Sequence, residues 1–487
     1  MSEKIRFGIP VHVNQALSAL LQIEEWPELQ LPLMNKIMID EADITSIFDN
    51  IEFESTSIMI STFLSQENHE KFDEYDKLPI GHRCGTAISG IAGDFVINAS
   101  QPSKTGNGSS LEFDGKGGAI RKANCRFHAI NWEVYSENNK AQTWACEIDK
   151  PAAFRPFGNL RFQLNLEVLW GYFFQGVYDY YLLPRQQRVF MLIVPQEGVE
   201  FDREKFALDI MALSFVFGEQ INVSSITGFG TECTPVAKIG GLVKSPTEPG
   251  WTTEPIPTVL TDDGETFAVE EVWIAPLFKR VSETVHNRPS VRLDYALDAY
   301  LDSIKPHVIA SYLRLQVILE SFSYWILKER NLAREGLVKD SNEWEKWVKK
   351  ELKEKIHSLA LDDYKDDLYL GIKGAYKHIS GRRVQDAFQL FQLGWTETMK
   401  AEIKLRNDVV HMMEMSKRKD GKIDSADLLP RLRLLQVMLI ALIARVVGYG
   451  GTIRFWKSGP HKENGWWRLD DDQKKEALHL FTNSVQP

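Results

Sequence analysis

The period of the apolar residues changes near residue 286, and this change constrains the fold most strongly. Before it, short alternating or β-branched runs recur between clusters of Gly, Asn and Ser, a pattern typical of strands. After it, apolar residues recur at the spacing of an amphipathic helix. A chain of 487 residues is also long for a single core. We therefore expect an α+β protein with a β-rich N-terminal domain, 1–285, and an all-α bundle, 286–487.

Short runs typical of strands recur through the β-rich part, for example at 36–39, 51–62, 94–99, 119–135, 143–148, 160–164 and 189–195. Glycine-rich stretches at 105–110 and 114–118 are interpreted as turns between them. One helix interrupts the strands, and Asp202 opens it. Residues 238–265 are rich in Pro, Gly and Thr, which predicts a long loop.

The helical part begins with a long stretch, 291–327, that we expect to break or bend at Pro306. Further helices are predicted at 344–361, 384–393 and 396–415. Asp424 or Ser425 then begins a last helix that ends near Gly448. Apolar residues occur all around this last helix, so we expect it to lie inside the bundle.

The composition limits the choice of partners. Charged residues make up 25% of the chain and the formal net charge is −10. A scaffold for nucleic acid is usually basic over its whole surface, so any RNA contact of this chain must be local. The four cysteines, Cys84, Cys125, Cys146 and Cys233, form no Cys-x-x-Cys pair, which predicts reduced thiols.

Targeting signals are not evident in the sequence. The N-terminus lacks the apolar core of a signal peptide. The most apolar run, 434–447, is interrupted by Gln436 and Arg445 and is too short to cross a bilayer. We expect a cytoplasmic protein that has no membrane partner.

One short motif contains residues suited to catalysis: Arg406, Asn407 and His411 in the predicted helix 396–415. Asn407 and His411 are four residues apart and share a helix face, and the long side chain of Arg406 reaches the same place. RNA cleavage without a metal needs proton transfer, for which histidine is suited, and a fixed positive charge for the phosphate, which arginine provides. The motif therefore predicts a ribonuclease that needs no metal and no cofactor.

The spacing from arginine to histidine is weak evidence by itself. It also occurs at Arg121 and His128, at Arg280 and His286, and at Arg454 and His461. We assign these three to a strand or to loops. Only the pair at 406 and 411 has an Asn after the Arg, lies in a predicted amphipathic helix and precedes a turn and a buried helix. The alternative is structural, with Arg406 paired to Glu402 and His411 in the core.

Arg-Asn-x-x-x-His on a late helix of a helical bundle resembles the motif of the HEPN ribonuclease family, over roughly residues 290–450. The resemblance implies a homodimer in which two copies of the motif form one cleft. It also implies that Arg406 holds phosphate, that Asn407 orients or polarises, and that His411 transfers protons. Glu320 is similar to an acidic residue that recurs in the first helices of the family. The β-rich region ahead of such a domain resembles the ApeA-type abortive-infection proteins of bacterial phage defence.

Other clusters have both a functional and a structural interpretation. Lys404, Lys417, Arg418 and Lys419 flank the motif and could bind RNA, or could form a solvated turn. The basic and tryptophan-rich tail could stack on bases, although packing onto the bundle is favoured. His82, Cys84, Cys125 and His128 could supply zinc ligands, but Cys125 and His128 on a strand would point to opposite faces, so no metal is expected.

Two functions remain open from the sequence. The first is an endoribonuclease of a phage-defence system, with RNA as substrate, a β-rich N-terminal domain as sensor or brake, and a phage product as trigger. The second is a non-catalytic binding protein that uses the helical bundle only to dimerise. The growth of cells that express the wild type or a His411→Ala variant discriminates between them.

Overall fold

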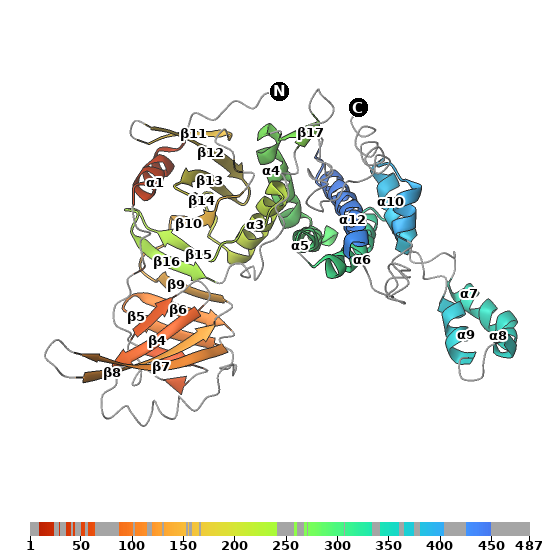
Figure 1. Cartoon of the computed structure of the whole chain (residues 1–487), viewed down its shortest axis with the longest axis horizontal. Helices are drawn as coiled ribbons and strands as arrows, with labels where there is room; N and C mark the ends of the chain where they lie inside the picture. Colours follow the sequence, from red (N-terminus) through yellow and green to blue (C-terminus); the bar gives the residue numbers. More distant parts are fainter. Residues whose placement is uncertain are drawn as a thin grey trace. The chain divides into compact units, whose positions relative to one another are not determined.

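The computed structural model describes residues 9–23, 29, 36–39, 42–43, 50–53, 57–63, 87–100, 103–113, 119–128, 131–151, 154, 158–164, 167–240, 258–260, 267–269, 271–305, 307–333, 341–359, 365–374, 380–403 and 425–449. The chain forms two compact units. The first comprises residues 1–213 and 220–247, and the second comprises residues 214–219 and 248–487. The protein is thus of mixed α/β composition, with a large antiparallel sheet and several helices (Figure 1).

The first unit is built on a twelve-stranded antiparallel sheet in the order β11-β12-β13-β14-β10-β15-β16-β9-β6-β5-β1-β2. Its strands are β1 Lys36–Ile39, β2 Ala42–Asp43, β5 Ala87–Ala92, β6 Phe95–Ser100, β9 Asn131–Ser136, β10 Thr143–Asp149, β11 Leu160–Leu164, β12 Glu167–Gln175, β13 Tyr178–Arg185, β14 Arg188–Pro195, β15 Ser225–Phe229 and β16 Pro235–Gly240. A four-stranded sheet in the order β3-β4-β8-β7 contains β3 Asn50–Phe53, β4 Ser57–Phe63, β7 Ser103–Phe113 and β8 Ala119–His128.

Two helices cover opposite faces of the β13–β14 hairpin (Figure 1). Helix α1, Val11–Leu21, places Val13 and Leu17 in one core with Leu192. Helix α3, Arg203–Phe217, lies on the other face, where the ring of Phe206 stacks on Tyr180 at 6.5 Å. Because both faces are covered, β13 and β14 are apolar almost throughout rather than alternating.

The start of α3 is fixed by the residue that the sequence predicted. Asp202 Oδ1 accepts hydrogen bonds from the backbone N–H groups of Glu204, at 2.8 Å, and Lys205, at 3.0 Å. This is an N-cap, which satisfies two of the donors that a helix leaves unpaired at its first turn. Further along, the buried Asp209 accepts a hydrogen bond from the Tyr180 hydroxyl at 2.7 Å. The cap fixes where α3 begins, and the Asp209 carboxylate holds α3 on the sheet.

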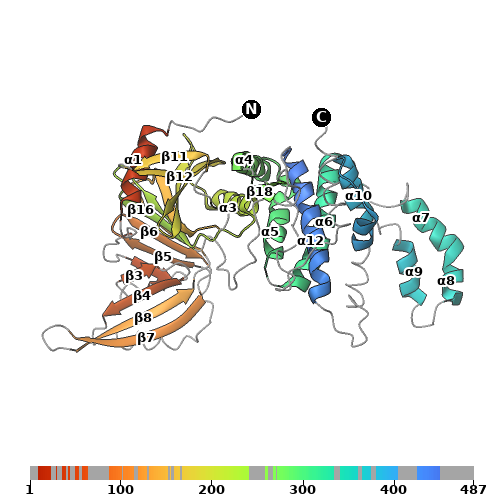
Figure 2. The ribbon, with the colours of Figure 1, turned by 45° about the horizontal axis from the view of Figure 1, so that its top comes forward.

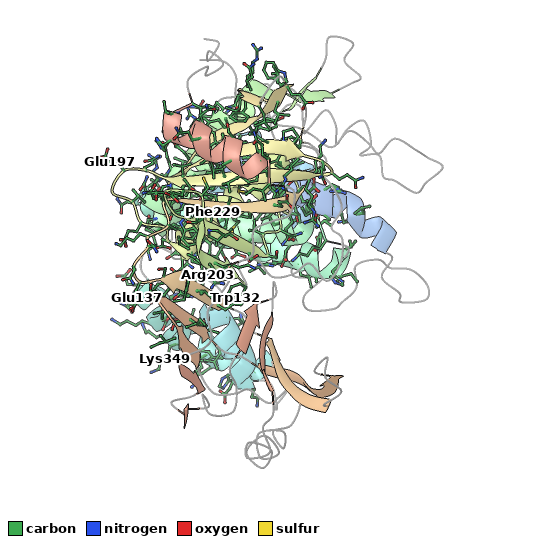
Figure 3. The ribbon with its side chains drawn as sticks, turned by 90° about the vertical axis from the view of Figure 1, so that its left-hand side faces the viewer. Trp132, Glu137, Glu197, Arg203, Phe229 and Lys349 are labelled. Atoms are coloured by element: carbon green, nitrogen blue, oxygen red, sulfur yellow. The ribbon has the colours of Figure 1, made fainter. Side chains whose placement is uncertain are left out.

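Close packing also fixes the central strands of the sheet. Gly240 on β16 pairs with Trp132 on β9, and a Cβ at residue 240 would lie 2.1 Å from the indole ring. Only glycine allows this approach. Arg203, labelled with Trp132 in Figure 3, donates a hydrogen bond to the carbonyl of Gly240 at 3.0 Å. The first turn of α3 is therefore tied to the middle of the sheet.

The second unit contains helices α4 Glu271–Asn287, α5 Leu293–Ser303, α6 Val308–Glu329, α7 Ser341–Trp347, α8 Lys353–Leu359, α9 Lys365–Gly374, α10 Ser380–Leu390 and α12 Ser425–Val446. A 3₁₀ turn, Pro289–Val291, precedes α5, and a π-helical segment, Val348–Leu352, joins α7 to α8. A two-stranded sheet pairs β17 Thr258–Leu260 with β18 Phe267–Val269. Helix α6 packs against α5, α10 and α12 (Figure 2).

Several helix predictions are confirmed. The break near Pro306 separates α5, which ends at Ser303, from α6, which begins at Val308. Helix α12 begins at Ser425, and its apolar residues from Leu432 to Val446 are buried, as expected for a helix inside a bundle. The HEPN-like character of this bundle remains a prediction. The predicted domain boundary at 285 falls within α4, which belongs to the second unit.

Other predictions are wrong, each for a physical reason. Residues 105–110, interpreted as a turn, belong to β7, because pairing with β8 supplies their backbone partners despite the Gly, Asn and Ser content. The runs 51–62 and 119–135 are each two strands. The predicted loop 238–265 contains the end of β16 and all of β17. Helix α4 occupies a segment assigned to the β-rich part, and it accommodates Pro276 in its interior.

Candidate active site

Most of the predicted site lies outside the described residues. This holds for the motif, Arg406, Asn407 and His411, and for the predicted RNA-binding residues Lys404, Lys417, Arg418 and Lys419. Their roles stay predictions. Of the predicted site residues, the structure describes Glu320. It also describes the start of the helix that leads into the motif, and the helices that contact this start.

The helix that precedes the motif begins where the sequence predicted. Residues 397–403 are helical. The side-chain oxygen of Thr396 accepts a hydrogen bond from the backbone N–H of Met399 at 3.2 Å, and its carbonyl accepts one from Lys400 at 3.1 Å. Thr396 is therefore the N-cap. Arg406 follows the last described residue of this helix by less than one turn.

Glu402, one turn before Arg406, is held by a buried polar network. Only 4% of Glu402 is exposed. Its Oε1 accepts a hydrogen bond from the hydroxyl of Tyr312 on α6. Its Oε2 accepts one from Arg431 on α12 at 3.1 Å. Both carboxylate oxygens therefore have a donor, and these donors compete with the pairing of Glu402 to Arg406 that the sequence allowed.

The backbone at residue 402 is held as well. The side-chain amide of Gln316 donates to the carbonyl of Glu402 at 3.0 Å and to the hydroxyl of Tyr312 at 3.1 Å. Tyr312 and Gln316 are four residues apart and lie on one face of α6. We call Tyr312, Gln316, Glu402 and Arg431 the Glu402 network. It fixes the position of the turn from which the motif continues.

Burial sets the electrostatics of this network. It raises the pKa of Glu402, although the hydrogen bond from Tyr312 and the charge of Arg431 act in the opposite direction. Burial, with the Glu402 charge as a second cause, also raises the pKa of Tyr312 far above its usual range. The Tyr312 hydroxyl therefore stays protonated at neutral pH and donates a hydrogen bond to Glu402.

A second buried network fixes α12 against α5. The side-chain amide of Gln436 donates to the carbonyl of Ser303 at 3.0 Å and to its hydroxyl at 2.9 Å. Arg433 in turn donates to Gln436 Oε1 at 3.0 Å, and burial lowers the pKa of Arg433 to about 10. Because buried polar groups need their partners, these bonds define one register of α12. In this register of α12, the Arg431 guanidinium lies within hydrogen-bond distance of the Glu402 carboxylate.

Glu320 lies on the same face of α6 as Gln316, one turn further along, and is partly buried. Its predicted supporting role stays a prediction. Sequence reasoning missed Tyr312, Gln316 and Arg431. The available signal was a polar residue, Gln316, inside the apolar run of α6, which in a buried helix indicates a hydrogen-bonding partner.

One argument for the motif needs correction. The competing pair Arg280 and His286 was assigned to a loop, but both residues lie on α4. Its apolar residues Ile274, Leu277 and Phe278 face the core at helical spacing, which Pro276 obscured. The competing pair Arg121 and His128 lies on β8, as predicted. A predicted helical context alone therefore does not distinguish the pair at 406 and 411 from the competing pairs. The Asn that follows Arg406 becomes the stronger distinguishing feature.

Of the weak zinc set, Cys125 and His128 lie on β8 at the predicted spacing along a strand. His82 and Cys84 lie outside the described residues. Cys146 and Cys233 are free thiols, the first of them buried. Burial also raises the pKa of Cys233, which keeps that thiol protonated and poorly nucleophilic.

Comparisons of this chain with models of protein families, with curated proteins and with solved structures give no match. Among the described helices, none combines the length and the apolar character that crossing a membrane requires.

Proposed function

We propose that this chain is a metal-independent endoribonuclease whose site is built from Arg406, Asn407 and His411. The observation that carries the proposal is the Glu402 network. It holds the turn immediately before the motif on α6 and α12 through both the carboxylate and the carbonyl of Glu402. Catalytic groups must be held in a fixed position, because small displacements of a reacting group lower the reaction rate by large factors.

The proposed chemistry is internal transesterification. The ribose 2′-oxygen attacks the adjacent phosphorus while a histidine takes its proton. The bond to the 5′-oxygen breaks and that oxygen receives a proton, which leaves a 2′,3′-cyclic phosphate and a 5′-hydroxyl. Arg406 holds the charged phosphate oxygens, and Asn407 orients or polarises the phosphate. One histidine does not readily serve as both base and acid, so we propose that His411 of two chains meets in one homodimeric site.

The proposal also covers regulation. An unrestrained ribonuclease harms its own cell, so the β-rich first unit is proposed as the sensor or brake and a phage product as its trigger. This places the protein in bacterial abortive infection, acting in the cytoplasm. The growth experiment compares cells that express the wild type or the His411→Ala variant, with and without phage, with total RNA as a second readout.

The variant His12→Ala is a matched control, because His12 is an exposed histidine on α1. We expect RNA loss and growth arrest with the wild type and with His12→Ala, and neither with His411→Ala or Arg406→Ala. If neither the wild type nor any variant lowers the amount of RNA, with or without phage, a non-catalytic dimeric binding protein explains the chain better.

A further inference from the structure

Among the described helices, only α3 is divided between the two compact units. Its residues 203–213 belong to the first unit, and its residues 214–217 belong to the second. The helix is nevertheless continuous from Arg203 to Phe217. A helix of about four turns is stiff, because every turn is hydrogen-bonded to the next. Its two ends therefore cannot move independently.

The C-terminal end of α3 is as well fixed as its N-terminal end. The backbone N–H of Glu219 donates to the carbonyl of Ser214 at 3.1 Å. The backbone N–H of Gly218 donates to the carbonyl of Phe215 at 3.0 Å. This pair of bonds is a Schellman motif, and it needs a residue with positive φ, which Gly218 supplies at +66°. With the cap at Asp202, α3 is closed at both ends.

Burial changes along α3. In the first turn Glu204 and Lys205 are exposed. Residues 212–217, in contrast, are all buried. Six consecutive residues point in every direction around a helix, so this end of α3 is enclosed on all sides. Because protein interiors are closely packed, an enclosed end cannot shift without displacing its neighbours.

The attachment of α3 in the first unit depends on a buried carboxylate. Asp209 accepts hydrogen bonds from the Tyr180 hydroxyl at 2.7 Å and from the backbone N–H of Val177 at 3.2 Å. The ring of Tyr180 also stacks on Phe206. Removal of the Tyr180 hydroxyl would take one donor from a buried carboxylate and leave the ring in place. That change would weaken the attachment without changing the packing.

The attachment of α3 in the second unit leads toward the predicted site. The ring of Phe215 meets Tyr300 of α5 edge-on, with ring centroids 5.3 Å apart and 76° between the planes. The carbonyl of Tyr300 accepts a hydrogen bond from the hydroxyl of Ser303 at 2.5 Å. Ser303 also accepts the two hydrogen bonds from Gln436 that define the register of α12. This register in turn supports the Glu402 network.

We propose that α3 couples the first unit to the Glu402 network, so that a weaker attachment of α3 to the sheet loosens α5, α12 and residues 397–403. Each contact in this series lies within one unit, and the helix itself joins the two series. The regulatory meaning, that the first unit acts on the ribonuclease site through α3, rests on the proposed function. The coupling is a free energy between two sites and can be measured without any reaction.

The test is hydrogen exchange of the full-length chain, followed by mass spectrometry on peptides that cover α3, α5, α12 and residues 397–403. The perturbation is Tyr180→Phe in the first unit. The matched control is Tyr181→Phe, the same substitution at the next residue of β13. Because side chains alternate along a strand, Tyr181 lies on the opposite face, in the core that contains Leu17 of α1.

We expect Tyr180→Phe to raise the exchange rate of α3 about tenfold or more, the effect of one lost hydrogen bond to a charged group. At α5, α12 and residues 397–403 we expect an increase of about 2- to 30-fold, the usual range for coupling through packed residues. Tyr181→Phe should leave exchange at α12 and residues 397–403 as in the wild type. Circular dichroism checks that each variant keeps its helix content.

A double-mutant cycle tests whether the effect passes through α3. Phe215→Leu keeps an apolar side chain but loses the ring that meets Tyr300. In this background, Tyr180→Phe should change exchange at α12 by a smaller factor than it does in the wild type.

Four results would overturn the inference. Tyr180→Phe leaves exchange at α3 unchanged, or raises it at α3 alone. Tyr181→Phe acts on α12 as strongly as Tyr180→Phe does. The effect of Tyr180→Phe on α12 keeps its full size in Phe215→Leu. Failure of the proposed function is a separate result, namely cleavage of RNA by His411→Ala at the wild-type rate, which leaves the exchange measurements unaffected.

Discussion

Replacement of Tyr312 by phenylalanine tests the Glu402 network with the smallest possible change. Tyr312 is fully buried, and its hydroxyl donates to Glu402 Oε1 and accepts from Gln316. Phenylalanine keeps the ring and its packing, but it leaves a buried carboxylate oxygen without its donor. The bond from Arg431 to the other oxygen remains.

The expected cost follows from these contacts. A hydrogen bond to a charged group contributes about 1.5–3 kcal/mol, and an unsatisfied buried acceptor costs about as much. Because Arg431 still partly compensates the charge, we expect a loss of about 2 kcal/mol in the local free energy of unfolding. That corresponds to roughly a 30-fold larger open population.

The chain has two compact units, so a global melting curve does not report on this site alone. Hydrogen exchange followed by mass spectrometry does, on peptides that cover residues 397–403 and α6. We expect faster exchange at both in Tyr312→Phe. Tyr324→Phe is the control, because Tyr324 lies on α6 and its contacts with Arg383 and Lys328 involve only the ring. Equal exchange in the two variants would refute the reasoning.

Two further predictions concern charge and capping. Because burial raises the pKa of Glu402, the folded state favours its protonated form, and this contribution to stability is lost as the pH rises above the ordinary value near 4.5. The local free energy of opening at residues 397–403, measured by hydrogen exchange, should therefore depend less on pH above that value in Glu402→Gln than in the wild type; equal slopes would contradict the assignment. Asp202→Ala should destabilise α3 by about 1 kcal/mol, measured by exchange of its first-turn amides, whereas the exposed Asp149→Ala should leave them unchanged.

Features with a strong local cause could be predicted from the sequence. Asp202 caps α3 and Thr396 caps the helix before the motif, because a cap involves only the next three residues. Pro306 separates α5 from α6 for an equally local reason. The burial of α12 follows from its uniformly apolar composition.

Features that depend on distant partners could not be predicted in this way. Strand β7 forms from Gly, Asn and Ser because β8 pairs with it, whereas the composition of residues 105–110 taken alone favours a turn. The Glu402 network joins residues 90 and 29 positions apart, so its members appear in the sequence only as isolated polar residues. Helix α4 lies before residue 286, where the sequence analysis placed the change of period, and Pro276 interrupts its helical pattern.

The most direct test of the central claim is cleavage of single-stranded RNA by the purified chain in the presence of EDTA, with analysis of the product ends. The account predicts fragments with 2′,3′-cyclic phosphate and 5′-hydroxyl ends from the wild type. It predicts a loss of at least about 100-fold in His411→Ala, the usual contribution of one acid–base group, and wild-type cleavage by His12→Ala. A His411→Ala variant that cleaves at the wild-type rate, or wild-type cleavage that EDTA abolishes, would contradict the account.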